Sequence, residues 1–422
     1  MERGVGSVIV DQIGADGALL ADVDTTLNER QKNELLLAAL PGATVEALYG
    51  ERVVRFKNQV VLKKQVTHLG KPWPEFKKRI QIPNSWLDVE RRALSDGLVP
   101  RFVGIYHYQG VTIFVDFDPT TYVQRKANNS AAHVSTNDLF QAQTMGQFTR
   151  VDRNGNRLTS VRSDQFADYL QWGVTTNPRL ETFRRFNAEL LTNQRLEALD
   201  AVKEMHDIQW PGRFQGEWPG FYLEYRFDKH IRTQGLSHLA EYQQDKSRGG
   251  YDYDLMFPDG STVQYYGDLK ASNLSAKESP GNDLEDLRRC VEQFGRFWYV
   301  VYEHETRHAR DNENLATIAW NDWRRSVGYR PASGKPYDPL SYASKFKESI
   351  RFAKMFVLEL NAANFDVVLR TFAQGRQPDG SARALKVMIN KKVIDNFLVY
   401  WETAPGHAKD GGLGDVEALL ED

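Results

Sequence analysis

The first half of the chain alternates apolar and polar residues with the period of a half-buried strand. Residues 52–82 alternate Val and Phe with charged side chains, and 100–119 holds two apolar runs around Gln109-Gly110. The first pattern predicts strands with their charges on an open face, and the second predicts a hairpin that turns at Gln109-Gly110. This half is therefore expected to be rich in strands.

Helical spacing of apolar residues is more frequent in the second half. The segments predicted as helices are 28–40, around 137–145, Pro178 through 208, 219–234, 283–296 and a segment after 340. A hairpin is predicted at 250–272 and a further strand at 297–304. Strands and helices that follow one another in this way from 215 onward predict a mixed α/β domain.

Composition limits the classes of protein and of site. The chain is 41% hydrophobic and 26% charged, which suits packed cores, and its formal net charge of −2 requires local basic patches to hold any polyanion. The one cysteine, Cys290, excludes a disulfide framework and nearly excludes a cysteine-based zinc site. With no signal-peptide core and no apolar run of membrane length, we expect a cytoplasmic protein without a membrane partner.

Residues 51–80 form a strongly basic stretch. They contain nine Lys and Arg against two Glu, a local charge of +7, with aromatic residues among the cations. Such a stretch suits phosphate contacts, although an ordinary solvated strand face is the alternative. The polar loop at 125–133 is a second candidate, because its side chains can bond base edges. The residues predicted to contact nucleic acid are Arg52, Arg55, Lys57, Lys63, Lys64, Lys77, Lys78, Arg79, Arg125 and Lys126.

The hairpin at 250–272, GYDYDLMFPDGSTVQYYGDLKAS, carries carboxylates and a lysine, although strands usually avoid Asp. Residues i and i+2 of a strand share a face, so Asp268 projects with Lys270, and Asp252 with Asp254. Two carboxylates on one side make an oxygen site of the kind that Mg²⁺ prefers. This combination suits phosphodiester hydrolysis, because the metal activates a water and the ammonium orients it or stabilises charge.

The length of the turn decides which aspartate works with Asp268. A three-residue loop beginning at Pro258 would pair Asp252 with Tyr266, and a five-residue loop beginning there would pair Asp254 with Tyr266. Both loops keep the carboxylates on one face, whereas a four-residue loop would put Asp268 on the opposite face from Asp254. The sequence leaves these alternatives open.

The run Asp254-Leu-Met-Phe, a turn and Tyr-Gly-Asp268-Leu-Lys270 resembles the motifs of the PD-(D/E)xK nuclease superfamily. That family includes most type II restriction endonucleases, together with resolvases and repair nucleases. The resemblance covers roughly residues 215–305, and Tyr253 stands where the family's first motif has proline. In the family the first Asp opens an apolar strand, which favours Asp254 over Asp252 as the first metal ligand.

The resemblance implies a fold and further site residues. The fold is a PD-(D/E)xK-like central mixed sheet flanked by helices, of the α/β (mixed α+β) class, with a strand-rich N-terminal domain added to it. Helices before and after the hairpin often contribute a glutamate and a glutamine, for which Glu224 and Gln293 are the candidates. The resemblance further implies that Asp254 and Asp268 hold the metal, with the Leu269 carbonyl as a further ligand. The residues expected to be catalytic are Asp254, Asp268, Lys270 and Glu224, and the expected accessory residues are Asp252 and Gln293.

The activity that the resemblance implies is hydrolysis of phosphodiester bonds in double-stranded DNA by a Mg²⁺-dependent endonuclease, with Mn²⁺ as a substitute metal. A sequence-specific type II restriction endonuclease is the particular expectation. It implies a homodimer, since cutting both strands needs two active sites, and it makes a cognate DNA methyltransferase a candidate partner. We expect a DNA-binding or recognition domain over 1–177, a nuclease domain with linking helices over 178–405 and a flexible acidic tail over 406–422.

Two other functions are kept as alternatives. One is a repair or phage-defence nuclease of the same superfamily that acts on other nucleic acid. The other is a non-catalytic DNA-binding protein, in which the hairpin charges protect an exposed sheet edge. Asp116 and Asp118, near His107, form a rival pair of carboxylates, but Asp-Pro commonly opens a turn, which is the interpretation we favour.

Overall fold

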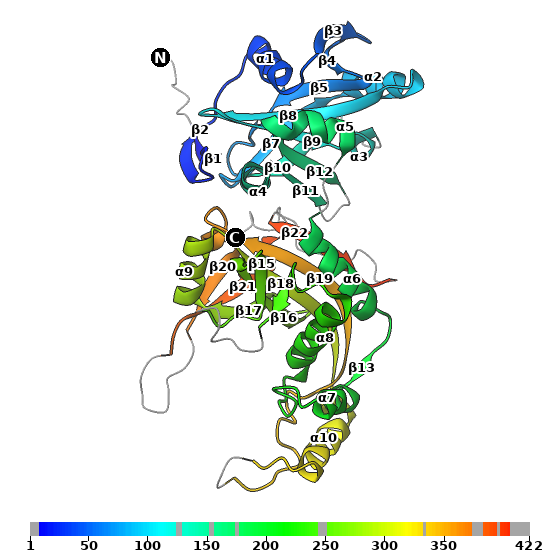
Figure 1. Cartoon of the computed structure of the whole chain (residues 1–422), viewed down its shortest axis with the longest axis vertical. Helices are drawn as coiled ribbons and strands as arrows, with labels where there is room; N and C mark the ends of the chain where they lie inside the picture. Colours follow the sequence, from blue (N-terminus) through cyan, green and yellow to red (C-terminus); the bar gives the residue numbers. More distant parts are fainter. Residues whose placement is uncertain are drawn as a thin grey trace. The chain divides into compact units, whose positions relative to one another are not determined.

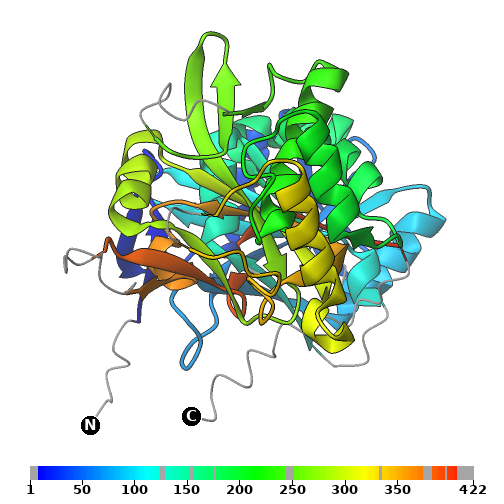
Figure 2. The same ribbon diagram turned by 90° about the horizontal axis from the view of Figure 1, so that it is seen from below.

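The computed structural model describes residues 8–123, 129–151, 156–173, 177–243, 251–331, 335–373, 383–394 and 397–405. The chain is mixed α/β, as predicted (Figures 1 and 2). It divides into two compact units. Unit 1 is Met1–Thr175 with Ala362–Asn364 and Asp395–Phe397, and unit 2 is the rest of the chain. The roles expected for the two parts stay predictions, and the expected tail at 406–422 lies outside the described residues.

Unit 1 is built on a seven-stranded sheet. Its strands are β3 (Thr44–Leu48), β4 (Glu51–Phe56), β5 (Gln59–Gln65), β8 (Val99–Tyr108), β9 (Val111–Phe117), β11 (Gln147–Val151) and β12 (Arg157–Arg162). Their order in the sheet is β11-β12-β9-β8-β5-β4-β3, and only β5 and β8 pair in parallel. The predicted hairpin is confirmed as β8 and β9, joined by Gln109 and Gly110, which both have positive φ.

Two smaller sheets and several helices complete unit 1. One sheet pairs β1 (Ile9–Ile13) with β2 (Leu19–Val23), and the other contains β6 (Thr67–His68), β7 (Lys77–Pro83) and β10 (Asn129–Ser135) in the order β10-β7-β6. The helices are α1 (Glu29–Ala39), α2 (Asn84–Ser95), α3 (Thr120–Val123), α4 (Thr136–Met145) and α5 (Phe166–Trp172), with a 3₁₀ turn η1 at Ser163–Gln165. The helices predicted at 28–40 and around 137–145 are therefore confirmed.

The start of α1 shows how local sequence places a helix against the sheet. The Asn28 side chain accepts a hydrogen bond from the Gln31 amide, and the Gln31 side chain accepts one from the Asn28 amide. This capping box satisfies backbone donors that a helix leaves open at its first turn. The helix then buries Leu36 in the core beside Phe114 and Phe166.

Unit 2 is built on a mixed sheet. Its strands are β13 (Leu196–Glu197), β14 (Glu241–Tyr242), β15 (Leu255–Asp259), β16 (Thr262–Asn273), β18 (Phe297–His308), β19 (Lys347–Leu360) and β22 (Leu398–Thr403). The order is β13-β19-β18-β16-β15-β14, and β22 also pairs with β19. β16 and β18 run parallel while the other pairs are antiparallel. A second sheet, of order β17-β21-β20, contains β17 (Glu278–Asp283), β20 (Leu369–Phe372) and β21 (Lys386–Asn390).

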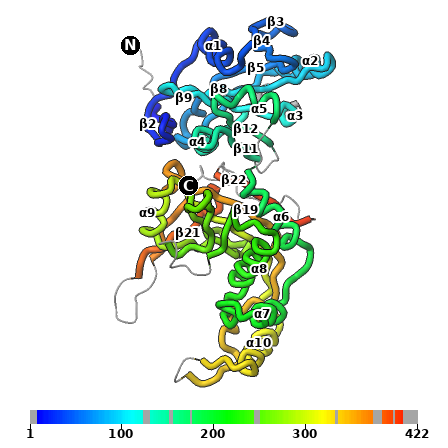
Figure 3. The backbone as a smooth tube through the Cα atoms, viewed as in Figure 1, coloured from blue at the N-terminus to red at the C-terminus, as the bar shows by residue number. Residues whose placement is uncertain are grey.

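Helices flank the mixed sheet of unit 2. They are α6 (Pro178–Leu190), α7 (Ala198–Asp207), α8 (Trp218–Gln234), α9 (Leu284–Phe294), α10 (Leu315–Ser326) and α11 (Phe365–Val368), with a 3₁₀ turn η2 at Ala309–Asn312. α8 packs on β16, and α8, α7 and α10 follow one another along one side of the unit (Figure 3). In the described segments, none of the helices is both long enough and apolar enough to cross a membrane.

Two helix predictions in unit 2 are wrong. The single helix expected from Pro178 through 208 is two helices, α6 and α7, because Leu196 and Glu197 pair with β19 between them. The helix expected after 340 is replaced by turns, and Tyr342 has a positive φ of 70° there, which a helix does not contain. α10 was not predicted.

His304 makes the stability of unit 2 depend on pH. It is 1% exposed on β18, and burial, together with the charges of Lys347 and Lys391, lowers the pKa of His304 to about 3. The unfolded side chain titrates near pH 6.5, so the unfolded state takes up the proton first as the pH falls. Stability is therefore lost from about pH 6.5 downward.

We expect the wild type to lose about 2 kcal/mol more unfolding free energy than His304→Asn between pH 7 and pH 5. Urea unfolding of both proteins at the two pH values measures this difference. The comparison with the variant removes the contribution of the other titrating groups, which both proteins share. Equal losses in the two proteins would show that His304 is not held neutral by burial.

Candidate active site

The hairpin of β15 and β16 closes differently from both predicted turns. Asp259 pairs with Thr262 across a two-residue turn, and the register then shifts by one residue, so that Leu255 pairs with Gly267. Neither the three-residue nor the five-residue loop forms, and both turn predictions are therefore wrong. A two-residue turn is tighter than either, and it is followed by a bulge.

The bulge places the two carboxylates on one face. An even-numbered turn alone would leave Asp254 and Asp268 on opposite faces of the hairpin. The extra residue, Gln264, shifts the register by one, so that Asp254, which directly precedes β15, falls opposite Asp268. The expected convergence of carboxylates is reached by this different route.

Asp254 and Asp268 lie side by side and are 3% and 2% exposed. The Asp254 amide donates to Asp268 Oδ1 at 3.2 Å, and the Leu269 amide donates to Asp254 Oδ2 at 3.3 Å. Asp252 is exposed instead. The structure thus brings Asp254, rather than Asp252, beside Asp268. That either carboxylate, or the Leu269 carbonyl, binds a metal stays a prediction.

Lys270 completes a group of three charges. Its Nζ atom lies 2.5 Å from Asp268 Oδ2, and its side chain is 25% exposed. The i and i+2 spacing puts both side chains on one strand face, as the sequence predicts. Because the carboxylate is buried, this ion pair is screened by water much less than a surface pair.

The burial of these charges shifts their pKa values. Burial raises the pKa of Asp254 well above its usual range, and the negative charges of Asp268 and Glu224 raise it further. Burial also acts to raise the pKa of Asp268, but the Lys270 charge and hydrogen bonds hold it below its usual value. Burial and the neighbouring negative charges thus disfavour the ionised form of Asp254, and a divalent cation bound at the pair would favour it.

Glu224 and Gln293, the two helix candidates, differ in their relation to the pair. Glu224 is half-buried on α8, where its Oε2 accepts from the Tyr242 hydroxyl at 2.7 Å, and its charge raises the pKa of Asp254. Gln293 is exposed on α9, and its side chain accepts from the Tyr251 hydroxyl at 2.9 Å. Glu224 is therefore close enough to Asp254 for its charge to act on that carboxylate. Among the described contacts, Gln293 has none with Asp254 or Asp268.

Asn282 and Tyr299 support Asp268, and the sequence analysis did not find them. The Asn282 side chain hydrogen-bonds to Asp268, and its Oδ1 accepts from the Tyr299 hydroxyl at 2.8 Å. A Cβ at Gly281 would lie 2.7 Å from that hydroxyl oxygen, so the close approach needs glycine. The segment that forms β17 has no clear strand pattern, so its spacing does not predict where Asn282 points. The one feature of the sequence that could have indicated Asn282 is its position after Gly281 and just before a predicted helix.

The donor set suits a small divalent cation. Mg²⁺ commonly binds proteins through one or two carboxylates and keeps its other positions for water and substrate phosphates. In the part of the chain that the structure describes, no group of three or more His, Cys, Asp and Glu side chains is placed to hold a metal. Asp254 and Asp268 therefore fit an open metal site with two carboxylates and do not fit a closed structural one.

Three lysines of the basic stretch are buried, so the prediction that its charges lie on an open face is wrong for Lys63, Lys77 and Lys78. Lys63 Nζ lies 2.9 Å from Glu29 Oε1, and the Lys77 ammonium lies 4.4 Å from the centre of the Trp73 ring. Other elements cover this strand face, which an alternating pattern cannot reveal.

The other predicted cations are placed differently. Arg52, Lys57 and Lys64 are exposed, and Arg55 and Arg79 are half-buried. Arg125 and Lys126 lie outside the described residues. Contact of these side chains with nucleic acid stays a prediction, and the exposed three offer the most accessible charges of the predicted set.

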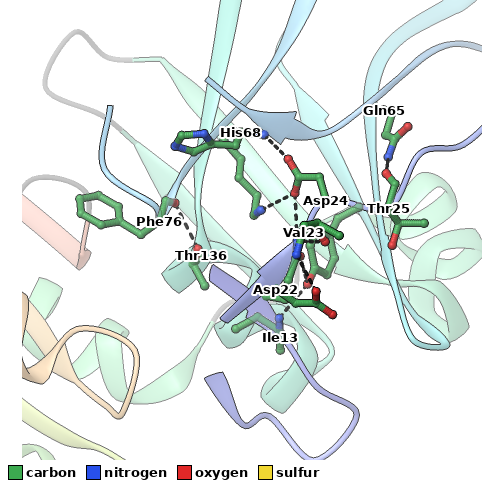
Figure 4. Close-up of polar contacts among 12 residues, drawn as sticks. Ile13, Asp22, Val23, Asp24, Thr25, Gln65, His68, Phe76 and Thr136 are labelled. Atoms are coloured by element: carbon green, nitrogen blue, oxygen red, sulfur yellow. Dashed lines mark hydrogen bonds and ion pairs between the residues drawn. The ribbon is translucent and has the colours of Figure 1, made fainter. Parts of the chain in front are cut away.

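Lys78 has a structural role inside unit 1. Its Nζ atom donates to Asp24 Oδ1 at 2.8 Å. The His68 amide donates to the other oxygen of this carboxylate, Asp24 Oδ2, at 2.6 Å, and Figure 4 shows these two residues. Removing one partner of such a pair leaves the other charge uncompensated.

We expect Lys78→Met to lower the unfolding free energy by about 3 kcal/mol in urea denaturation. Lys64→Met, on β5 of the seven-stranded sheet, is the exposed control. Equal small losses in both variants would contradict the buried pair.

The rival carboxylates Asp116 and Asp118 have separate hydrogen-bond partners. The Thr120 amide donates to Asp118 Oδ1 at 3.0 Å, which confirms the turn interpretation. Asp116 instead accepts from Arg101 Nη1 at 2.9 Å. His107 bonds to Thr112 Oγ1 at 2.8 Å and contacts neither carboxylate among the described hydrogen bonds.

Comparison with known proteins matches a segment of unit 1. Residues 57–170 match the family model described as methylase-associated X1 (MTaX1), about a quarter of the chain. Neither a curated protein nor a solved structure matches the chain significantly. The match connects this segment of unit 1 with methylase-associated proteins, and it does not reach the hairpin that carries Asp254 and Asp268.

Proposed function

We propose that this protein is a Mg²⁺-dependent endodeoxyribonuclease that hydrolyses phosphodiester bonds in double-stranded DNA. The observation that carries the proposal is the buried group of Asp254, Asp268 and Lys270. Two acids held side by side away from water cost folding free energy, so stability alone does not account for them. Perturbed charges of this kind gather at functional sites.

The residues have distinct roles in the proposed reaction. When bound, Mg²⁺ lowers the pKa of a water and neutralises charge on the phosphate. Asp254 and Asp268 hold the cation, and the Leu269 carbonyl is a further ligand. Lys270 keeps a positive charge beside them, where it orients the attacking water or stabilises the charge of the transition state. Asn282 keeps the Asp268 carboxylate in its orientation.

A role in a restriction system is the finer part of the proposal. The resemblance of the hairpin to type II restriction endonucleases and the methylase-associated match in unit 1 arise from separate parts of the chain. Both fit a nuclease that acts with a cognate DNA methyltransferase. A homodimer would supply two sites for the two strands, and the exposed cations Arg52, Lys57 and Lys64 are the candidate phosphate contacts.

Incubation with unmethylated phage DNA, in Mg²⁺ or in EDTA, tests the proposal with the wild type and Asp268→Ala. Discrete Mg²⁺-dependent fragments that the variant does not produce are the expected result. A smear that the variant does not produce would indicate a repair or defence nuclease of low sequence specificity. DNA binding without cleavage, unchanged in the variant, would replace the proposal with a non-catalytic DNA-binding protein.

A further inference from the structure

A cavity of about 270 Å³ opens in unit 1, and its lining residues except Gly173 lie in the segment that matches the methylase-associated family model. Its walls come from β8, β9, β12 and the end of α5. Such a volume is below the usual range for drug-sized ligands and suits a smaller molecule. The lining surface is about equally polar and apolar, and its polar residues are Arg101, Asp116, Asp118, Arg157, Thr159 and Tyr169.

Asp116 lines this cavity and has one carboxylate oxygen without a hydrogen-bond partner among the described residues. The residue is 5% exposed, and its Oδ2 accepts from Arg101 Nη1 at 2.9 Å and from the Tyr169 hydroxyl at 2.7 Å. Its Oδ1 is buried and has no hydrogen-bond partner in the described part of the chain. A buried acceptor without a hydrogen bond destabilises the folded protein. It therefore indicates a ligand that contains a hydrogen-bond donor.

The carboxylate is rigidly held, so its free oxygen has a fixed direction. Arg101 Nε also donates to Gln59 Oε1 at 2.9 Å, which anchors the arginine to β5. Thr159 in the cavity wall is 2% exposed, and its hydroxyl bonds to Thr149 Oγ1 at 3.0 Å. A site whose polar groups are already fixed by neighbours loses little entropy when it binds a ligand.

The surroundings of the cavity suit a nucleotide. Arg157, exposed at the start of β12, offers a cation for a phosphate. Trp172 directly precedes the cavity residue Gly173 and is 77% exposed, and Lys57 is exposed and contacts Gln171 on the same helix. Exposed aromatic residues with nearby cations are typical of surfaces that stack bases and contact phosphates.

We propose that this cavity binds a nucleobase with an exocyclic amine. The amine donates to Asp116 Oδ1, and Arg157 contacts the attached phosphate. A carboxylate accepts from the amine of cytosine and repels the carbonyl oxygen that uracil has at the same position. The base belongs either to a free nucleotide or to DNA from which it has been turned out of the stack, as base-modifying enzymes do.

Isothermal titration with dCMP and with dUMP, in EDTA, tests the first source. We expect dCMP to bind at least about tenfold more tightly than dUMP and Asp116→Asn to lose this preference. Arg157→Ala, an exposed change that leaves the Asp116 and Arg101 pair intact, weakens dCMP binding by about tenfold. Arg91→Ala, exposed on α2 outside the cavity, is the matched control and binds like the wild type.

A duplex with one 2-aminopurine tests the second source, because this amine-bearing base fluoresces more strongly when it leaves the stack. If fluorescence rises with the wild type and does not rise with Asp116→Asn or Arg157→Ala, the bound base is taken from DNA. This conclusion holds even if the wild type does not bind the free nucleotides. The proposal is overturned if neither probe binds, or if both variants bind both probes like the wild type. All these binding measurements are made without metal. Their outcome therefore does not depend on whether the protein has the proposed Mg²⁺-dependent nuclease activity.

Discussion

Asp254→Asn is expected to abolish Mg²⁺-dependent cleavage and, at the same time, to stabilise the metal-free protein. Loss of a metal ligand removes several kcal/mol of transition-state stabilisation, so cleavage falls by about 10³-fold or more. Burial and the charges of Asp268 and Glu224 raise the pKa of Asp254, which means that the native state penalises its ionised form. Asparagine keeps the shape and removes that penalty, which raises the unfolding free energy by about 1 kcal/mol.

The sign of the pH dependence follows from the raised pKa of Asp254. The folded state binds a proton that the unfolded state has already released, so the wild type loses stability as the pH rises. The advantage of Asp254→Asn is therefore larger at pH 8 than at pH 5. Urea unfolding in EDTA at both pH values, together with a cleavage assay in Mg²⁺, measures both effects.

Asp259→Asn is the matched control, because Asp259 is exposed at the turn of the same hairpin. It should change neither stability nor cleavage. A destabilised but active Asp254→Asn variant would mean that the carboxylate has a structural role. Loss of cleavage in Asp252→Asn, with full activity in Asp254→Asn, would move the first metal ligand to the exposed aspartate.

Lys270→Met is expected to lower the rate of cleavage by about 10²- to 10³-fold while the protein still binds Mg²⁺. The ammonium lies 2.5 Å from Asp268 Oδ2 and is not a metal ligand, so its loss removes charge stabilisation and leaves the oxygen donors in place. The Lys270 charge also opposes the effect of burial on the pKa of Asp268. Without it that pKa rises, and residual cleavage should need a higher pH.

Single-turnover rates at several Mg²⁺ concentrations and pH values separate these effects. Lys229→Met serves as the control, because Lys229 is exposed on α8 and pairs with Glu204. It should cleave like the wild type. A Lys270→Met variant with an unchanged rate, or one whose rate is fully restored by more Mg²⁺, would show that the lysine takes no part in the chemistry.

The sequence predicted what depends on strand periodicity. The hairpin, the shared face of Asp268 and Lys270, and the helix that carries Glu224 all follow from local spacing. The register does not, because the bulge at Gln264 has no local signal and yet decides which aspartate lies opposite Asp268. Asn282 was missed for a related reason, since it reaches Asp268 from a strand with no recognisable pattern.

Contacts between distant segments limited the other predictions. Lys78, like the exposed Lys64, directly follows another lysine in a strand, and the placement of Asp24, far earlier in the chain, makes it a buried partner. Similarly, the break between α6 and α7 arises because Leu196 pairs with Ile350 of β19. A local pattern reports the secondary structure that a segment prefers and contains no information about the element that later covers it.

The account depends most on a divalent cation bound between Asp254 and Asp268, and this can be tested without any substrate. Fe²⁺ occupies oxygen sites like those of Mg²⁺, and with ascorbate and peroxide it generates radicals that cut the nearby backbone. We predict chain cuts close to residues 254 and 268 that excess Mg²⁺ suppresses and that Asp268→Asn does not show. Cuts at other positions only, or the same cuts in the variant, would contradict the proposed metal site.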